Sequence, residues 1–202
     1  MKVLLLNGSP HKNGCTATAL AEVGNTLEAL GIQAETFWIG NKPVPSCIAC
    51  GGCRNGNGCV YGDCVNEILQ RNQEFDGLVV GSPVYYGCAS GQIMSFLDRL
   101  FFASGGCFAG KAAAAVVSCR RGGASTAFQQ LNMFFGINNM VIATSQYWNQ
   151  VHGNTPQEVR QDLEGLQTMR TLARNLAWIL QCQQAGGPAP THEAKISTNF
   201  IR

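Results

Sequence analysis

The sequence is poor in charge and has no apolar run long enough to cross a bilayer. Charged residues make up 13% of its 202 residues, and 14 basic against 12 acidic side chains leave a net charge of +2. The basic residues are scattered, whereas binding to nucleic acid or to an anionic membrane requires them to cluster, so neither partner is expected. The apolar start, residues 3–6, is too short for a signal peptide. We therefore expect a cytoplasmic protein without a membrane partner.

Cysteine and glycine, in contrast, are abundant, with 10 and 24 residues respectively. Cytoplasmic thiols stay reduced, so this many cysteines indicates metal binding or redox chemistry rather than disulfides. The glycines indicate tight loops in which the backbone approaches a ligand closely. A chain of this length with 46% hydrophobic residues can bury a full core in one domain.

Short apolar runs alternate with stretches of helical periodicity. The pattern predicts strands at residues 3–6, 33–38, 77–81, 112–118 and 140–144. It predicts helices at residues 15–30, 65–73, 91–102, 125–135 and 155–182, the last opening with a capping box of Thr155 and Glu158. Elements in this order form a parallel sheet with helices on both faces, and ligands bind at the carboxyl ends of its strands.

This organisation predicts one domain over residues 1–182 and a C-terminal tail over residues 183–202. The tail either docks on another surface or stays mobile. Inside the domain, residues 40–64 form a loop rich in Cys, Gly, Pro and Asn. Loops of this length are usually functional.

The loop after the first strand, residues 7–16 with the sequence NGSPHKNGCT, leads directly into a helix. Its hydroxyl side chains, its backbone N–H groups and the positive end of the helix dipole together favour an anion. The loop matches neither GxxxxGK[ST] nor GxGxxG, so a monophosphate fits better than a nucleoside triphosphate or a dinucleotide. The alternative is an ordinary turn in which Thr16 caps the helix and His11 is solvated.

The loop after the third strand reads GSPVYYG over residues 81–87 and places two tyrosines at the end of a buried strand. An isoalloxazine ring needs a flat apolar wall and backbone polar groups along one edge, and this loop can supply both. Otherwise the tyrosines pack the loop against the next helix.

Both loops resemble those of the flavodoxin-like NAD(P)H-dependent FMN reductases. The likeness extends over LNGSP at 6–10 with Asn13 and Thr16, GSPVYYG at 81–87, SGQ at 90–92 and FLDR at 96–99. Met94 departs from it, because many members carry Lys there, and we expect that difference to alter surface or partner contacts. The resemblance implies an α/β flavodoxin-like three-layer sandwich with a five-stranded parallel sheet, bound FMN, NAD(P)H as electron donor, and a homodimer or homotetramer.

The resemblance implies that these two loops bind FMN. The loop after the fourth strand belongs on the same edge of the sheet, where its N–H groups and Arg120 would stabilise negative charge on the reduced flavin. Otherwise its arginines are ordinary surface residues. The cofactor-binding residues would be Ser9, His11, Asn13, Cys15, Thr16, Pro83, Val84, Tyr85, Tyr86, Gly87, Ser118, Cys119, Arg120 and Gly123.

Four cysteines, Cys47, Cys50, Cys53 and Cys59, form a C-x2-C-x2-C-x5-C run. This spacing can wrap an iron–sulfur cube, and it suits zinc less well. The run resembles the cluster motif of iron–sulfur flavoproteins, which implies a [4Fe–4S] cluster; bare thiols, a disulfide and zinc are the alternatives. We interpret Cys15, Cys88, Cys107, Cys119 and Cys182 as small buried hydrophobes.

The loop after the fifth strand carries Trp148 and His152, which are candidates for a substrate pocket; otherwise it is a packed loop with a solvated His. We expect an enzyme that passes electrons from NAD(P)H through FMN to a quinone, a nitro compound, a flavin or an iron protein. No proton-transferring catalytic residue is assigned. The alternatives are an electron carrier fed by ferredoxin, with the cluster on the cysteine loop, and a flavin-binding regulator.

Overall fold

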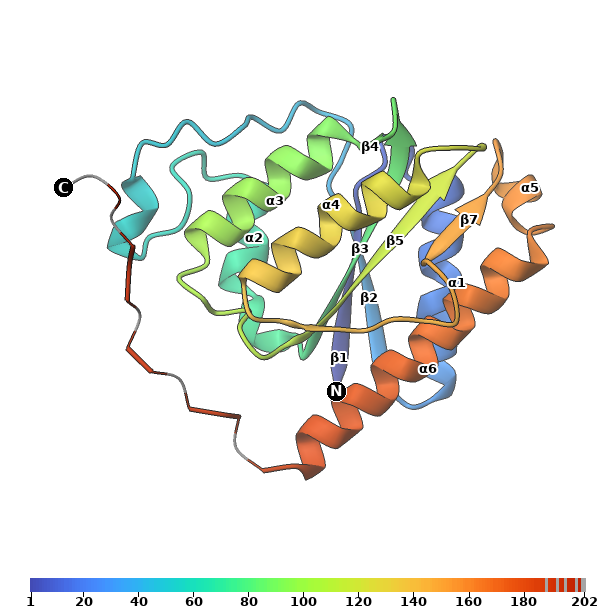
Figure 1. Cartoon of the computed structure of the whole chain (residues 1–202). Coiled ribbons are helices and arrows are strands. Elements are labelled where there is room, and N and C mark those ends of the chain that lie inside the picture. The colour runs from blue at the N-terminus through green and yellow to red at the C-terminus, as the bar shows by residue number, and fades with distance from the viewer. Residues whose placement is uncertain (188, 192, 195, 199, 201–202) are drawn as a thin grey trace.

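A parallel sheet runs through the molecule, and helices cover both of its faces (Figure 1). The computed structural model describes residues 1–187, 189–191, 193–194, 196–198 and 200. The strand order is β2-β1-β3-β5-β6, with β1 at Lys2–Asn7, β2 at Gln33–Trp38, β3 at Gly77–Tyr85, β5 at Ala112–Cys119 and β6 at Val141–Ile142. The order reverses direction between β1 and β3, which is the flavodoxin-like arrangement. The predicted fold class is therefore confirmed.

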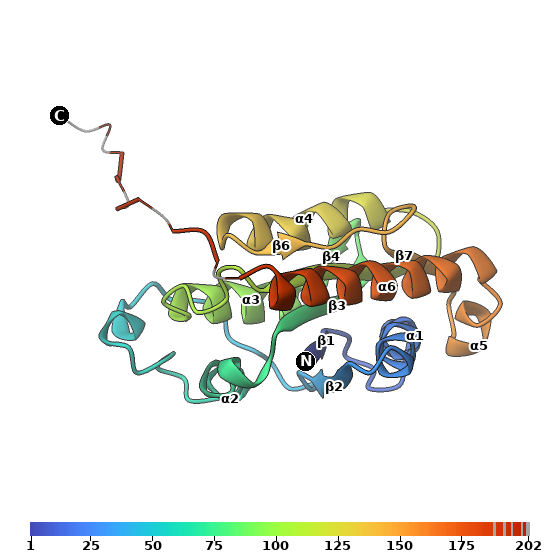
Figure 2. The same ribbon diagram turned by 90° about the horizontal axis from the view of Figure 1, so that it is seen from below.

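The alternation of side chains along the strands builds two separate cores. Val3 and Leu5 of β1 pack with α1 (Cys15–Ala29) and α6 (Leu163–Ala185). Leu4 and Leu6 face the opposite side, which is covered by α2 (Cys64–Gln70), α3 (Gly91–Ala103) and α4 (Ala124–Ile137). The view from below shows these two helical layers on either side of the strands (Figure 2). Both faces are thus buried, as a parallel sheet requires.

The fifth predicted strand differs from the observed one. Only Val141–Ile142 forms β6, and the chain then leaves the sheet and returns as β7 (Gln150–His152), which pairs with β5 further along the same edge. Between the two strands the Ser145 Oγ lies 2.7 Å from the Asn149 Oδ1 and 2.6 Å from the Tyr147 carbonyl oxygen, and these two acceptors share its single O–H hydrogen. These local side-chain bonds compete with strand pairing, which the apolar pattern alone did not reveal.

The last predicted helix is divided in two. The predicted cap at Thr155 is correct, because its Oγ1 accepts from the Glu158 N–H, but that helix, α5, ends at Val159. A second cap, Asp162, then accepts from the Gly165 N–H and starts α6. At the break, the Asp162 carboxylate also accepts a hydrogen bond from the His152 N–H at 2.6 Å, which ties this part of the chain to β7.

Helix α6 continues to Ala185, three residues beyond its predicted end. Of the predicted tail, residues 188, 192, 195, 199 and 201–202 lie outside the described residues, and the division between domain and tail stays a prediction. In the described part of the chain, no helix is long and apolar enough to cross a membrane.

The loops after β1 and β3 touch at Gly8. Its N–H donates to the Gly81 carbonyl at 2.8 Å, and the Ser90 hydroxyl donates to the Gly8 carbonyl at 2.8 Å. A Cβ at Gly8 would lie 2.6 Å from the Ile93 Cβ and 2.9 Å from the Gly81 oxygen. Glycine is therefore needed at this position to let two backbones and α3 meet.

Replacing Gly8 with Ala should destabilise the protein by about 2 kcal/mol, because the new methyl group overpacks against α3 and β3. Urea unfolding measures the loss. Gly91→Ala is the matched control, since a Cβ there meets nothing within 4 Å, and it should leave the midpoint unchanged or slightly raised. Equal midpoints for the two variants would contradict the close approach at Gly8.

Candidate functional site

The N-terminus of α1 lies at the carboxyl edge of the sheet and has no side-chain cap. Its N-cap residue is Gly14, which has no side chain that could cap the helix. Thr16, which the alternative interpretation made the cap, instead shares a 2.8 Å hydrogen bond with the Ser118 hydroxyl in the loop after β5. The cap in that alternative is wrong, whereas His11 is exposed, as that alternative states. The N–H groups of the first turn cannot reach a carbonyl within the helix, so they can bind an anion.

The loop before this helix is held in shape by its own polar groups. The Ser9 N–H donates to the Asn7 side chain at 3.1 Å, and the His11 N–H donates to the Ser9 Oγ at 3.2 Å. The Trp38 indole N–H donates to the Ser9 carbonyl at 2.8 Å. His11, Lys12 and Asn13 are exposed. The loop is therefore preformed, with a buried inner layer and an outer layer that is open to solvent.

The two tyrosines occupy the tip of a hairpin between β3 and β4 (Cys88–Ala89). Tyr86 and Gly87 form its turn with φ of 51° and 77°. The Tyr86 side chain is fully exposed and Tyr85 is 45% exposed. The interpretation that these tyrosines pack the loop against a helix is therefore wrong for Tyr86. An exposed aromatic side chain in a strained turn is available for contact with a flat ligand.

The loop after β5 packs against the turn of this hairpin. Gly123 has φ of 87°, and a Cβ there would lie 2.6 Å from the Gly87 Cα. Ser118 and Cys119 are buried, whereas Arg120 is exposed. The three loops with predicted FMN-binding residues therefore meet at one edge of the sheet, as the sequence predicted from strand order.

The loop between β6 and β7 reaches the same edge. Trp148 and His152, the predicted substrate-pocket residues, line one surface hollow together with Asp162 and Glu164. The His152 N–H donates to the Asp162 carboxylate at 2.6 Å. The next residue, Gly153, accepts from the Cys15 thiol at 3.7 Å. The structure thus brings both candidates together beside the start of α1.

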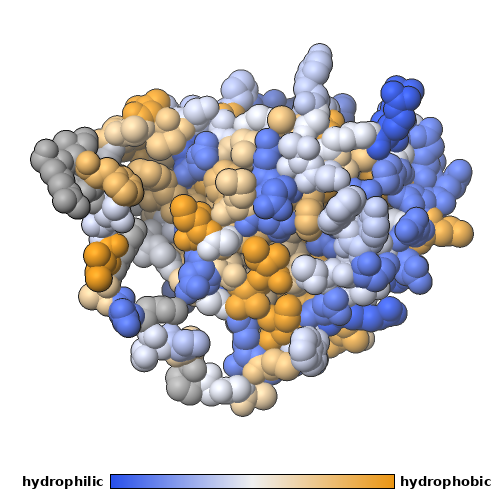
Figure 3. Space-filling model, viewed as in Figure 1, coloured by the Kyte–Doolittle hydropathy of each residue, from blue (hydrophilic) through white to orange (hydrophobic). Residues whose placement is uncertain are grey.

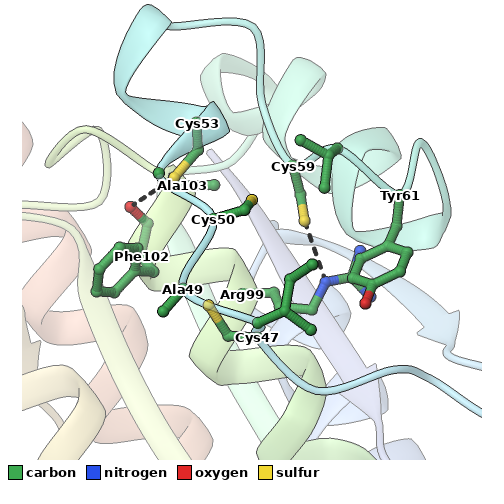
Figure 4. A pocket seen from close by; sticks show the side chains of 12 residues that line it. Cys47, Ala49, Cys50, Cys53, Cys59, Tyr61, Arg99, Phe102 and Ala103 are labelled. Carbon is green, nitrogen blue, oxygen red and sulfur yellow. Dashed lines mark hydrogen bonds between the residues drawn. The ribbon is translucent and has the colours of Figure 1, made fainter.

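The four cysteines of the C-x2-C-x2-C-x5-C run line a second pocket, at the other end of α3 (Figure 4). No disulfide joins any two of these four cysteines. Apolar atoms dominate its walls, with Ile48, Val60 and Phe102 among them. In the described residues no three His, Cys, Asp or Glu side chains meet closely enough to hold one metal ion. The thiols line a cavity instead of converging on one point.

A buried arginine forms one wall of this pocket. Arg99 donates two hydrogen bonds to the Asp63 carboxylate, at 2.7 and 2.8 Å, and its Nε–H donates to the Cys59 Sγ at 3.2 Å. Partial burial alone would raise the pKa of Asp63, but the Arg99 guanidinium and the Val65 N–H hold it below its ordinary value. Both partners are therefore charged at neutral pH.

The sequence alone did not reveal a role for this arginine. A signal was present, because Arg99 occupies the apolar stripe of α3 that also carries Phe96 and Leu100. A charged residue on a buried stripe requires a partner. The partner, Asp63, is 36 residues away in sequence, and the sequence pattern could not identify it.

The scattered cysteines differ from one another. Cys119 is buried, and burial raises the pKa of the Cys15, Cys107 and Cys119 thiols, which keeps them protonated at neutral pH. Cys88 and Cys182 are exposed, so their interpretation as buried hydrophobes is wrong. Cys88 is exposed because it follows the hairpin turn, and Cys182 because it lies on the outer face of α6.

The strand order and the three adjoining loops define a flavodoxin-like protein with an uncapped helix N-terminus at the edge of its sheet. Comparison with known proteins specifies it further. Residues 1–155 match the family of NADPH-dependent FMN reductases, and the chain belongs to this family. It is thus a flavoprotein oxidoreductase, and the predicted resemblance is confirmed.

Several relatives match almost the whole chain. An iron–sulfur flavoprotein of Methanocaldococcus jannaschii is 33% identical over 191 residues, covering 90% of this chain and 98% of the relative. One of Methanosarcina thermophila is 29% identical over 188 residues, covering 91% and 97%. Among solved structures, RosB with a bound 8-demethyl-8-formylriboflavin 5'-phosphate intermediate has a TM-score of 0.73 at 14% identity, covering 100% of this chain and 94% of that chain. That last likeness shows the fold alone.

Replacing Asp63 with Asn should destabilise the reduced protein by about 3 kcal/mol, because it leaves the buried Arg99 charge without a partner. Since the Asp63 pKa is lowered in the folded state, its contribution is complete above its unfolded value of about 3.9 and is lost as the pH falls through the lower folded value. Urea unfolding at pH 7 and at low pH measures both effects. The control is Asp98→Asn on the exposed face of α3. If Asp63→Asn lowers the free energy of unfolding at pH 7 no more than this control does, the buried ion pair is contradicted.

Proposed function

We propose that the protein is an FMN-dependent oxidoreductase that passes electrons from NAD(P)H to a quinone, a nitro compound, a flavin or an iron protein. The observation that carries this proposal is the meeting of three loops around an uncapped helix N-terminus and an exposed tyrosine hairpin. Membership in the NADPH-dependent FMN reductase family supports it. Bound FMN would supply the hydride and electron chemistry.

The residues at this edge fit a ribityl phosphate and a flat ring. The phosphate would be held by first-turn N–H groups of α1, including those of Cys15 and Thr16, and by the loop side chains Ser9, His11 and Asn13. The Thr16 hydroxyl is already hydrogen-bonded to the Ser118 hydroxyl. Thr16 would therefore bind the phosphate through its backbone N–H. Because the backbone donors of this loop and of the first turn of α1 are already in place, phosphate binding would require little reorganisation of the protein.

The ring would be held between the hairpin and the loop after β5. Tyr85 or Tyr86 would supply an aromatic wall, and backbone groups from Pro83, Val84 and Gly87 would lie along an edge. The backbone of Ser118, Cys119 and Gly123 and the side chain of Arg120 would stabilise negative charge there. Trp148 and His152 would contact the substrate. No side chain at this edge is assigned a proton transfer.

Replacing Ser9 with Ala should weaken FMN binding about fivefold. The change removes the acceptor of the His11 N–H and loosens the loop, and one such hydrogen bond contributes about 1 kcal/mol. Quenching of flavin fluorescence during titration of the apoprotein measures the affinity. The control is Thr26→Ala, whose hydroxyl bonds to the Glu22 carbonyl within α1 and which should bind FMN as the wild type does. An unchanged affinity for the Ser9 variant would remove Ser9 from the site.

Anaerobic reduction tests the function directly. The FMN-loaded protein is mixed with NADH or with NADPH in a stopped-flow instrument, and the flavin absorbance should bleach within seconds with at least one of them. Addition of a quinone or a nitro compound should then restore it. A colourless protein that refuses FMN at micromolar concentration would overturn the proposal.

A second candidate is an electron carrier that accepts electrons from ferredoxin and holds a [4Fe–4S] cluster on Cys47, Cys50, Cys53 and Cys59. Two observations favour it: these four thiols line one cavity, and full-length relatives are named iron–sulfur flavoproteins. Thiolate sulfur is the donor that such clusters take. The same flavin site would serve both candidates.

Anaerobic purification followed by iron and acid-labile sulfide analysis separates the two. A carrier should contain about four irons per chain, and reduced ferredoxin should bleach its flavin faster than either nicotinamide. If the cysteines are bare thiols, form a disulfide or bind zinc, the FMN-dependent oxidoreductase remains the proposed function. Metal analysis and thiol titration distinguish among these three states.

A homodimer or homotetramer also belongs to this proposal. Large apolar side chains are exposed outside the candidate site, including Met133 and Ile137 of α4, at 64% and 87%, and Trp178 of α6, at 66%. Figure 3 shows several apolar areas between hydrophilic ones on the face that carries α4. Burial of such side chains between subunits would stabilise an oligomer, and light scattering measures its mass.

A further inference from the structure

Arg99 is the only charged side chain in the described part of the chain that is almost fully buried, with 1% of its surface exposed. Burying a guanidinium is costly, and a structure retains one only where its donors are satisfied. Nothing in the flavin site contacts it. Its position in the cysteine pocket therefore requires its own explanation.

Three partners fix the guanidinium in place. Asp63 accepts from both terminal nitrogens, the Pro45 carbonyl accepts a further bond at 3.3 Å, and the Tyr61 ring lies 4.6 Å from the guanidinium carbon. The remaining Nε–H has one acceptor, the Cys59 Sγ at 3.2 Å. Figure 4 shows this bond on the pocket side of the arginine. The donor that faces the cavity is thus held rigidly by the others.

Cys59 is also fixed through its backbone. Its N–H donates to the Asn66 side-chain oxygen at 2.7 Å, and its carbonyl accepts from the Asn66 side-chain nitrogen at 2.7 Å. The other three thiols lie on a looser segment: Cys47 and Cys50 are exposed, and the Cys53 thiol makes one long contact of 3.9 Å to a carbonyl. Of the four, Cys59 alone has both its backbone and its sulfur held by side chains.

We propose that Arg99 is a positioning residue that presents the Cys59 thiolate as the preformed ligand of an iron–sulfur cluster and raises the reduction potential of that cluster. This inference rests on the second candidate function. Added negative charge on the reduced cluster is stabilised by a cation and by a hydrogen bond to a ligand sulfur, and such bonds tune cluster potentials. A structural arginine that only neutralises Asp63 would leave the potential unchanged.

The test compares Arg99→Lys with the wild type after anaerobic cluster reconstitution. Lysine keeps the charge for Asp63 but lacks the planar fork that serves Asp63 and Cys59 together. Optical redox titration should show the one-electron reduction of the cluster disfavoured about tenfold, which corresponds to a shift of 59 mV to lower potential. The control is Arg71→Lys, in a surface ion network with Glu35 and Glu74, and its potential should equal that of the wild type.

A second measurement does not require that Arg99→Lys folds. Wild-type protein labelled with ¹⁵N only in its arginine guanidinium groups is reduced, and pulsed EPR of the cluster should detect a coupled nitrogen that persists in Arg54→Lys, which replaces the arginine of the cysteine loop itself. If circular dichroism shows that Arg99→Lys is folded, its cluster should no longer be coupled to an arginine nitrogen.

The inference is overturned if the wild-type cluster shows no arginine nitrogen, or if Arg99→Lys and Arg71→Lys have the same potential. It is also overturned if the wild-type chain binds no iron. Flavin content, measured on the same samples, separates that result from a failure of the proposed function, because a chain that holds FMN without iron remains an FMN oxidoreductase.

Discussion

The contact between two backbones at Gly8 is the constraint on which the candidate site depends. At this point β1 ends against the Gly81 carbonyl, and α3 begins where Ser90 donates to the Gly8 carbonyl. Because no side chain separates these segments, the loop before α1 and the tyrosine hairpin start from one rigid base. Both loops are therefore held at a fixed distance, which a ligand with a phosphate at one end and a ring at the other requires.

Helix α3 connects the carboxyl edge of the sheet, where the candidate site lies, to the cysteine pocket. Ser90 caps it beside Gly8, and Arg99 lies nine residues further along, a rise of about 14 Å in an α-helix. One short, well-packed helix thus sets the spacing of two groups of chemically reactive residues. In this arrangement, α3 joins the base of the tyrosine hairpin to Cys59, because Ser90 caps the same helix that carries Arg99.

Most of the fold could be predicted because its signals are local. Residues 33–38 match β2 from end to end, and the strands of β1, β3 and β5 follow from their apolar runs. The predicted element boundaries are wrong where a polar side chain forms hydrogen bonds that the apolar pattern does not show. Ser145 and Asn149 interrupt the last strand, and Asp162 divides the last helix between His152 and Gly165. In the sequence, such side chains cannot be distinguished from ordinary loop or helix residues, because their hydrogen-bond partners are not known.

The order of strands and helices, the three loops at the carboxyl edge and the spacing of the four cysteines follow from the amino-acid sequence alone, since each depends on residues that are close along the chain. Which polar groups remain free to bind a ligand depends on the packed fold. Thr16 is paired with Ser118 across 102 residues, and Arg99 reaches Cys59 across 40. Pairings of this kind depend on how the loops pack in space, and periodicity carries no information about that.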